Sequence, residues 1–133
     1  LRLAQTIEQE AAKHDVCVPI LLEVNVAQEE TKFGLKMEEV LPLVESVAEF
    51  PHIKIQGLMT IAPYVENSEE NRIYFQQLKK LSVDISSENI DNVSMKVLSM
   101  GMTGDYAVAV SEGATYVRVG TGIFGERNYA VSV

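Results

Sequence analysis

Residues 16–26 read VCVPILLEVNV, a mainly apolar and β-branched run in which Glu23 and Asn25 are the strongly polar members. A strand that hardly alternates between apolar and polar positions is typical of a parallel sheet with both faces covered. We therefore expect a parallel strand here, with other elements packed on both of its sides.

The same order, one strand followed by one helix, repeats along the chain. Leu3, Ile7 and Ala11 recur every four residues and predict a helix ahead of the first strand. Further helices are predicted over residues 37–50, 69–86 and 105–111, and further strands over residues 54–61, 97–100 and 116–119. In the helix over 69–86, the residues expected to point inward are Ile73, Phe75, Leu78 and Leu81.

Alternating strands and helices favour an α/β fold built from parallel β-α units with right-handed crossovers. Four parallel strands form either a small open sheet or one half of an eight-stranded (β/α)8 barrel of the TIM type, which needs roughly 250 residues. The pattern alone leaves both architectures open.

Composition narrows the class of protein. The chain has 133 residues, 47% of them hydrophobic, which suits a single segment of one domain. Its net charge of −8 disfavours binding to nucleic acid or to an anionic membrane. One cysteine, Cys17, excludes an internal disulfide and a cysteine-rich zinc site. With neither a membrane-spanning run nor a signal-peptide pattern, we expect a cytoplasmic protein.

Two glycine-bearing turns follow the last two predicted strands. Residues 99–105 read SMGMTGD and residues 118–125 read RVGTGIFG. Glycine allows backbone N–H groups to approach an anion closely, and serine or threonine hydroxyls donate further hydrogen bonds. Either turn alone is more readily explained by glycines that shape a tight bend. Because successive parallel strands place their ends side by side, the two turns together favour a phosphate site.

Two charged side chains have alternative interpretations. Arg118 is the one charge inside the last predicted strand, so it pairs with a carboxylate or meets a ligand, and the residues alone favour the ion pair. Lys32 offers an amine in the loop after the first strand, although a solvated lysine is the commoner case. We find no nucleophile-base-acid set and no metal-ligand spacing, so no catalytic or metal-binding residue is assigned.

Several motifs match one family in order and spacing, over nearly the whole chain. They are LLEVNV at 21–26, EETKFG at 29–34, GLM at 57–59, LSMGMTGDY at 98–106 and VRVGTGIFGERNY at 117–129. The sequence resembles the pyridoxal phosphate homeostasis protein family, also called the proline synthetase co-transcribed homologues. One departure is Thr103, where the family usually has serine and the hydroxyl is retained.

The resemblance implies an alanine racemase-like, fold-type III barrel that binds pyridoxal 5′-phosphate (PLP). By this likeness, the phosphate is held by Thr103 and by the backbone N–H groups of Gly120 and Thr121, while Arg118 faces the pyridine nitrogen. A guanidinium only donates hydrogen bonds, so it would keep that nitrogen unprotonated and weaken the ring as an electron sink. The implied role is therefore a PLP-binding protein of vitamin B6 homeostasis rather than an enzyme. The alternative is an amino-acid racemase of the same fold.

Members of the family are longer, and their Schiff-base lysine ends the first strand of the barrel. None of the lysines in this chain matches that motif, so we expect strands five to eight, the C-terminal half, without the covalent anchor. The implied partners are PLP and PLP-dependent client enzymes. A half-barrel also leaves two open sheet edges, which predicts self-association.

Overall fold

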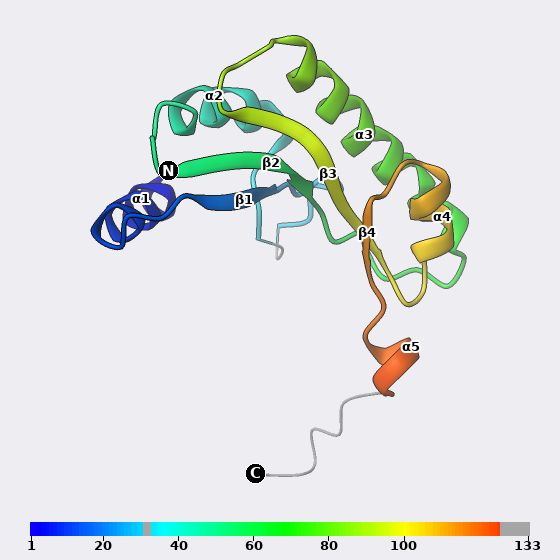
Figure 1. Ribbon diagram of the computed structural model, residues 1–133. Coiled ribbons are helices and arrows are strands. Elements are labelled where there is room, and N and C mark those ends of the chain that lie inside the picture. The colour runs from blue at the N-terminus through cyan, green and yellow to red at the C-terminus, as the bar shows by residue number, and fades with distance from the viewer. Residues whose placement is uncertain (31–32, 126–133) are drawn as a thin grey trace.

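The computed structural model describes residues 1–30 and 33–125 (Figure 1). Its strands are all parallel and form one sheet in the order β1-β2-β3-β4, which confirms the predicted α/β class. The elements in chain order are α1 (Arg2–Lys13), β1 (Val18–Glu23), α2 (Met37–Val47), β2 (Ile53–Met59), the 3-10 helix η1 (Ser68–Asn71), α3 (Arg72–Ser87), β3 (Val93–Met102), α4 (Tyr106–Ser111), β4 (Tyr116–Arg118) and α5 (Thr121–Phe124).

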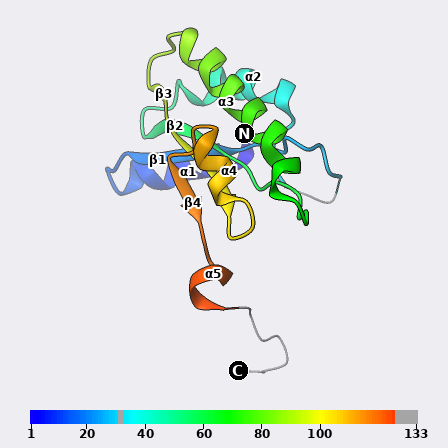
Figure 2. The same ribbon diagram turned by 90° about the vertical axis from the view of Figure 1, so that its right-hand side faces the viewer.

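The sheet is curved, and the four strands form a half-barrel. Helices α2, α3 and α4 lie on the convex side (Figures 1 and 2). No helix covers the concave side within the part of the chain that the structure describes, so the expectation of a sheet covered on both faces is wrong for these residues. The concave side is the face that points toward the axis of a complete barrel.

A row of leucines fixes which side of each strand faces the helices. Leu22 is paired with Leu58 and Leu58 with Leu98, and all three are buried in the core. The next row of paired residues consists of Glu23, Met59 and Ser99. Since neighbouring residues of a strand point to opposite faces, this second row lies on the concave side.

In the middle of the sheet, the residues that face the helices switch from odd-numbered to even-numbered positions of β2. In β2 they are Ile53 and Ile55 before an irregularity in the pairing, and Leu58 after it. At this irregularity the backbone of Gly57 lies so close to Val97 that a Cβ at position 57 would overlap the carbonyl oxygen of Val97. A bulge that re-aims side chains in this way commonly carries a glycine where two backbones approach.

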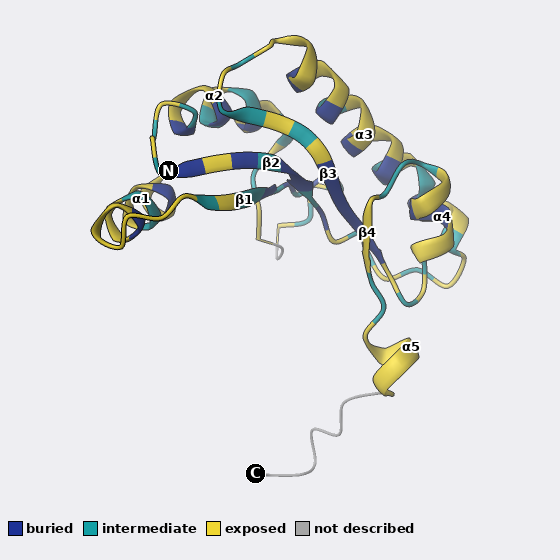
Figure 3. Ribbon diagram, in the orientation of Figure 1, coloured by how far each residue is buried: buried dark blue, intermediate teal, exposed yellow. Residues whose placement is uncertain are grey.

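Several predicted boundaries and inward positions need correction. Strand β3 starts at Val93, four residues earlier than predicted, because half-buried Val93 and Met95 alternate with exposed residues in the pattern of a one-sided strand. The helix predicted over 37–50 ends at Val47. Buried and exposed positions alternate along α3 (Figure 3). Ile73 points outward with 54% of its surface exposed, while Phe75 and Leu78 are fully buried.

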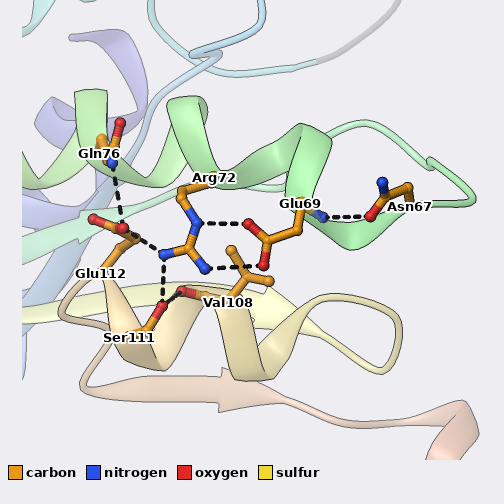
Figure 4. A network of polar contacts seen from close by, with 7 residues as sticks. All are labelled: Asn67, Glu69, Arg72, Gln76, Val108, Ser111 and Glu112. Carbon is orange, nitrogen blue, oxygen red and sulfur yellow. Dashed lines mark hydrogen bonds and ion pairs between the residues drawn. The ribbon is translucent and has the colours of Figure 1, made fainter.

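Polar contacts join elements that are distant in sequence. His52, directly before β2, is held by Glu8 of α1. The Glu8 carboxylate accepts the backbone N–H of His52 at 2.9 Å and lies 2.7 Å from Nδ1 of His52. Arg72 forms ion pairs with Glu69, at 2.7 Å, and with Glu112, at 2.6 Å, and so ties the start of α3 to the end of α4 (Figure 4).

Among the described residues, no helix is both long enough and apolar enough to cross a lipid bilayer.

Burial on α3 yields a paired prediction. Phe75→Ala removes a fully buried ring and should lower the free energy of unfolding by about 3–5 kcal/mol. Ile73→Ala removes an exposed side chain from the same helix and should change it by no more than about 0.5 kcal/mol. Urea denaturation followed by circular dichroism measures both, and equal losses for the two variants would contradict the observed orientation of α3.

The close approach at Gly57 yields a second prediction. Gly57→Ala should destabilise the fold by more than about 4 kcal/mol, because the new methyl group must push the backbones of β2 and β3 apart. Gly104→Ala is the matched control, since a Cβ there meets nothing within 4 Å. Thermal unfolding of both variants decides the matter, and a native-like melting temperature for Gly57→Ala would refute the close approach.

Candidate functional site

Two turns at the carboxyl ends of β3 and β4 form the candidate site. The first is closed by two hydrogen bonds between its end residues: the backbone N–H of Met102 donates to Asp105 Oδ1 at 2.7 Å, and the backbone N–H of Asp105 donates to the carbonyl of Met102 at 3.2 Å. Thr103 and Gly104 occupy the middle of this turn. The turn therefore presents the Thr103 side chain at the end of the sheet.

Thr103 contacts the second turn directly. Its Oγ1 accepts a hydrogen bond from the backbone N–H of Gly122 at 3.0 Å and another from the hydroxyl of Thr121 at 3.1 Å. Gly122 allows this contact, since a Cβ at that position would lie only 2.9 Å from Cγ2 of Thr103 and from Cγ1 of Val119. The two glycine-bearing turns are thus in contact.

The donors at this contact suit an anion. Thr103 Oγ1 accepts two hydrogen bonds, and its own O–H proton has no acceptor within residues 1–30 and 33–125. In the same ranges, the backbone N–H groups of Gly120 and Thr121 donate to no protein acceptor. A Cβ on Gly120 would meet nothing within 4 Å, so the space beside it is open. Hydroxyl and backbone donors around open space are the ordinary ligands of a phosphate group.

Arg118 lies at the end of β4, and its side chain crosses the ends of two neighbouring strands. Its Nη2 donates to the backbone carbonyl of Thr60 at 2.7 Å and to that of Ser99 at 3.3 Å. Its Nε is buried and has no partner in the described part of the chain. No carboxylate lies within ion-pair distance of Arg118 there, so the structural ion pair favoured by the residues alone is not formed among these residues.

The electrostatic surroundings of Arg118 are mixed. Partial burial lowers the pKa of its guanidinium, and the negative charges of Glu23 and Asp105 oppose that shift. Because the ordinary pKa of an arginine lies far above neutral pH, the side chain keeps its charge at neutral pH. Arg118 is therefore a half-buried cation whose Nε–H is enclosed and has no acceptor within the described residues.

The predicted site residues fall into two groups. Thr103, Gly120 and Thr121 belong to the two turns that are in contact. Arg118 makes its hydrogen bonds elsewhere, to the backbone carbonyls of Thr60 and Ser99. Lys32 and the end of the last motif, residues 126–129, lie outside the described residues.

Sequence reasoning missed one buried residue beside the site. Asn71 has 1% of its surface exposed and donates to the carboxylate of Asp105 at 2.8 Å. Asp105 is part of the quoted motif and carried that signal, whereas Asn71 sits at an ordinary helix start 34 positions away in the sequence.

Comparisons with known proteins show the family of this chain. The family model described as alanine racemase, N-terminal domain, matches residues 1–128. The pyridoxal phosphate homeostasis protein of Aquifex aeolicus is 47% identical over 127 residues, which are 96% of this chain and 55% of that protein. This chain thus spans about half the length of the curated relatives that it matches.

Solved structures with the same fold include a PLP-binding relative and a more distant enzyme. PipY from Synechococcus elongatus, solved with PLP bound, superposes with a TM-score of 0.81 at 27% identity, covering 93% of this chain and 57% of PipY. Alanine racemase from Clostridium difficile, at 14% identity and a TM-score of 0.73 over 95% of this chain and 34% of the enzyme, shares the fold alone. The chain therefore belongs to the alanine racemase N-terminal domain family and, within it, is similar to the pyridoxal phosphate homeostasis proteins.

Proposed function

We propose that this chain binds PLP and that its contribution is the phosphate-holding part of a PLP homeostasis protein. The single observation that supports this most is the contact between Thr103 and the 120–122 turn. There, among the described residues, the Thr103 hydroxyl proton and the backbone N–H groups of Gly120 and Thr121 have no protein acceptor and lie beside open space. A phosphate monoester needs donors of this kind. Membership of a family whose relative PipY was solved with PLP supports the choice of PLP over other phosphate esters.

Each proposed residue has a distinct task. Thr103 donates its hydroxyl proton to a phosphate oxygen, and Gly120 and Thr121 donate their backbone N–H groups. Arg118 donates a guanidinium N–H to an acceptor on the concave side, which for this ligand is the pyridine nitrogen. PLP supplies an aldehyde and a conjugated ring that stabilises carbanions when the ring nitrogen is protonated. Since an arginine beside that nitrogen only donates hydrogen bonds, it withholds this protonation.

This arrangement favours storage or transfer of PLP over catalysis. The curated relatives are homeostasis proteins, and Arg118 works against the electron-sink behaviour that most PLP enzymes use. We infer that the four strands correspond to strands five to eight of a complete barrel, that the Schiff-base lysine belongs to the other half, and that PLP-dependent enzymes are the clients of the whole protein. The amino-acid racemase alternative is supported only by distant relatives that share the fold.

We also propose that, where the other half of the barrel is not supplied, a second copy of this chain covers the concave side. Strands β1 and β4 are the two free edges of an all-parallel sheet. A two-fold axis along the barrel axis would place β4 of one copy beside β1 of the other, still parallel, and close eight strands. The concave rows include half-buried Leu21 and Met59, so closure would remove apolar surface from water.

Removing the Thr103 hydroxyl tests the PLP site. Thr103→Ala should weaken PLP binding about tenfold or more, because a hydrogen bond to a charged group contributes about 1.5–3 kcal/mol. Thr103→Ser keeps the hydroxyl and should stay within about threefold of the original affinity, by the same estimate. Titration of PLP absorbance in phosphate-free buffer measures the dissociation constants.

Thr115→Ala is the matched control, since its hydroxyl bonds to the backbone of Leu98 and not to the site, and its PLP affinity should equal that of the original chain. Borohydride reduction followed by mass spectrometry should leave no PLP on any lysine. Normal affinity in Thr103→Ala would discard the assigned phosphate ligands, and failure of the original chain to bind PLP would discard the function.

Self-association is tested by light scattering coupled to size-exclusion chromatography. The expected mass is twice 14.7 kDa. Leu21→Lys places a charge on the concave side and should shift the population to monomer, whereas Ile73→Lys, on the exposed side of α3, should not. A single monomeric species at all concentrations would exclude closure by a second copy.

A further inference from the structure

Asn71 is a buried polar residue at the junction between η1 and α3. Its side-chain Nδ2 donates to the backbone carbonyl of Pro63 at 2.9 Å and to Oδ2 of Asp105 at 2.8 Å. With 1% of its surface exposed, the amide is placed by these partners, because a buried polar group without them would be costly. The residue thus connects the loop after β2 to the turn after β3.

The position of Asn71 before a helix suggests capping as the simpler explanation, but its contacts differ from those of a cap. A capping side chain accepts a hydrogen bond from a backbone N–H in the first turn of its own helix. The side chain of Asn71 makes no such bond to α3, and its Oδ1 has no partner among the described residues. Its polar contacts instead reach Pro63, eight positions away, and Asp105, 34 positions away.

Asp105 passes this constraint on to the turn that carries Thr103. One carboxylate oxygen accepts from Asn71, and the other accepts from the backbone N–H of Met102 at 2.7 Å. The two ends of the 102–105 turn are therefore held together by a carboxylate whose own orientation is fixed by a buried amide. Hydrogen bonds that involve a charged group are among the stronger ones in proteins.

The 102–105 turn contacts the 120–122 turn through Thr103. The backbone N–H of Gly122 and the hydroxyl of Thr121 both donate to Thr103 Oγ1. A continuous path of hydrogen bonds and turn backbone thus runs from the start of α3 to the proposed phosphate site. A displacement of the 102–105 turn by even one ångström would break the 3.0 Å contact with Gly122.

We propose that Asn71 and Asp105 are positioning residues, which set the place of the Thr103 hydroxyl relative to the 120–122 turn without touching the ligand. The part of this inference that concerns PLP affinity rests on the function proposed above. The part that concerns the geometry of the two turns does not require any ligand.

The neighbouring residue offers a matched control. Arg72 also links α3 to α4, but it does so at the far end of α4, through Ser111 and Glu112 (Figure 4). Removing Arg72 therefore loosens the same pair of helices and leaves the 102–105 turn untouched. A purely structural role for Asn71 predicts that the two substitutions behave alike.

The experiment compares Asn71→Leu, which keeps the size of the side chain, with Arg72→Ala in the full chain. In the absence of PLP, the ¹H–¹⁵N resonance of Gly122 should move in Asn71→Leu and stay in place in Arg72→Ala. In PLP titrations, Asn71→Leu should weaken binding at least tenfold, and Arg72→Ala should stay within twofold. The ³¹P resonance of bound PLP should change only in Asn71→Leu.

Asp105→Asn provides a second variant, which decides the question if Asn71→Leu does not fold. It keeps one acceptor for two donors and should shift the Gly122 resonance in the same direction by a smaller amount. An unmoved Gly122 resonance in the variants of Asn71 and Asp105, or the same change in Arg72→Ala, overturns the inference. If the original chain binds no PLP while the Gly122 shifts occur as expected, the proposed function fails and the positioning role stands.

Discussion

The pairing of Leu22, Leu58 and Leu98 across three strands sets which face of the sheet every other side chain of these strands takes. These side chains are buried beneath the helices, so their row can face only the convex side. Because side chains alternate along a strand, the next row, with Glu23 and Ser99, is forced to the concave side. A slip of one residue would exchange the two rows and bury a carboxylate in the core. The burial of the leucines therefore places the polar side chains of Glu23 and Ser99 on the concave side.

The same constraint explains why the middle of the sheet is irregular. The apolar positions of β2 follow one parity at Ile53 and Ile55 and the other at Leu58, so the strand needs a bulge to bury all three. The bulge brings the backbone of Gly57 against Val97, which leaves no space for a side chain. Beyond the bulge, Met59 and Ser99 are paired in a row that lies on the concave side. The irregularity in pairing therefore allows both halves of β2 to bury their apolar side chains.

At the carboxyl ends of β3 and β4, two turns held by hydrogen bonds lie near a cation that has no direct ion pair among the described residues. The turns that carry Thr103 and Gly122 are tied to each other and, through Asp105 and Asn71, to the start of α3. Arg118 is anchored by backbone carbonyls rather than by a carboxylate, so its charge is not neutralised by a direct ion pair among the described residues. A cation held in this way attracts electron-rich acceptors but offers no proton acceptor of its own. Donors of this kind suit the binding of an anion, as the proposed function requires.

The sequence alone could establish the class of fold, the order of the main strands and helices along the chain, and the position of the two glycine-bearing turns. It could do so because hydrophobic periodicity and glycine-hydroxyl motifs are local, and Thr103, Gly120 and Thr121 belong to such motifs. The tertiary structure alone decided that Ile73 points outward, that β3 extends back to Val93, and that Arg118 bonds to carbonyls of two other strands. It alone also showed the link from Asn71 to Asp105 across 34 positions. Contacts of this kind depend on how far the sheet curves and on where each helix packs, and no local pattern of residues encodes those distances.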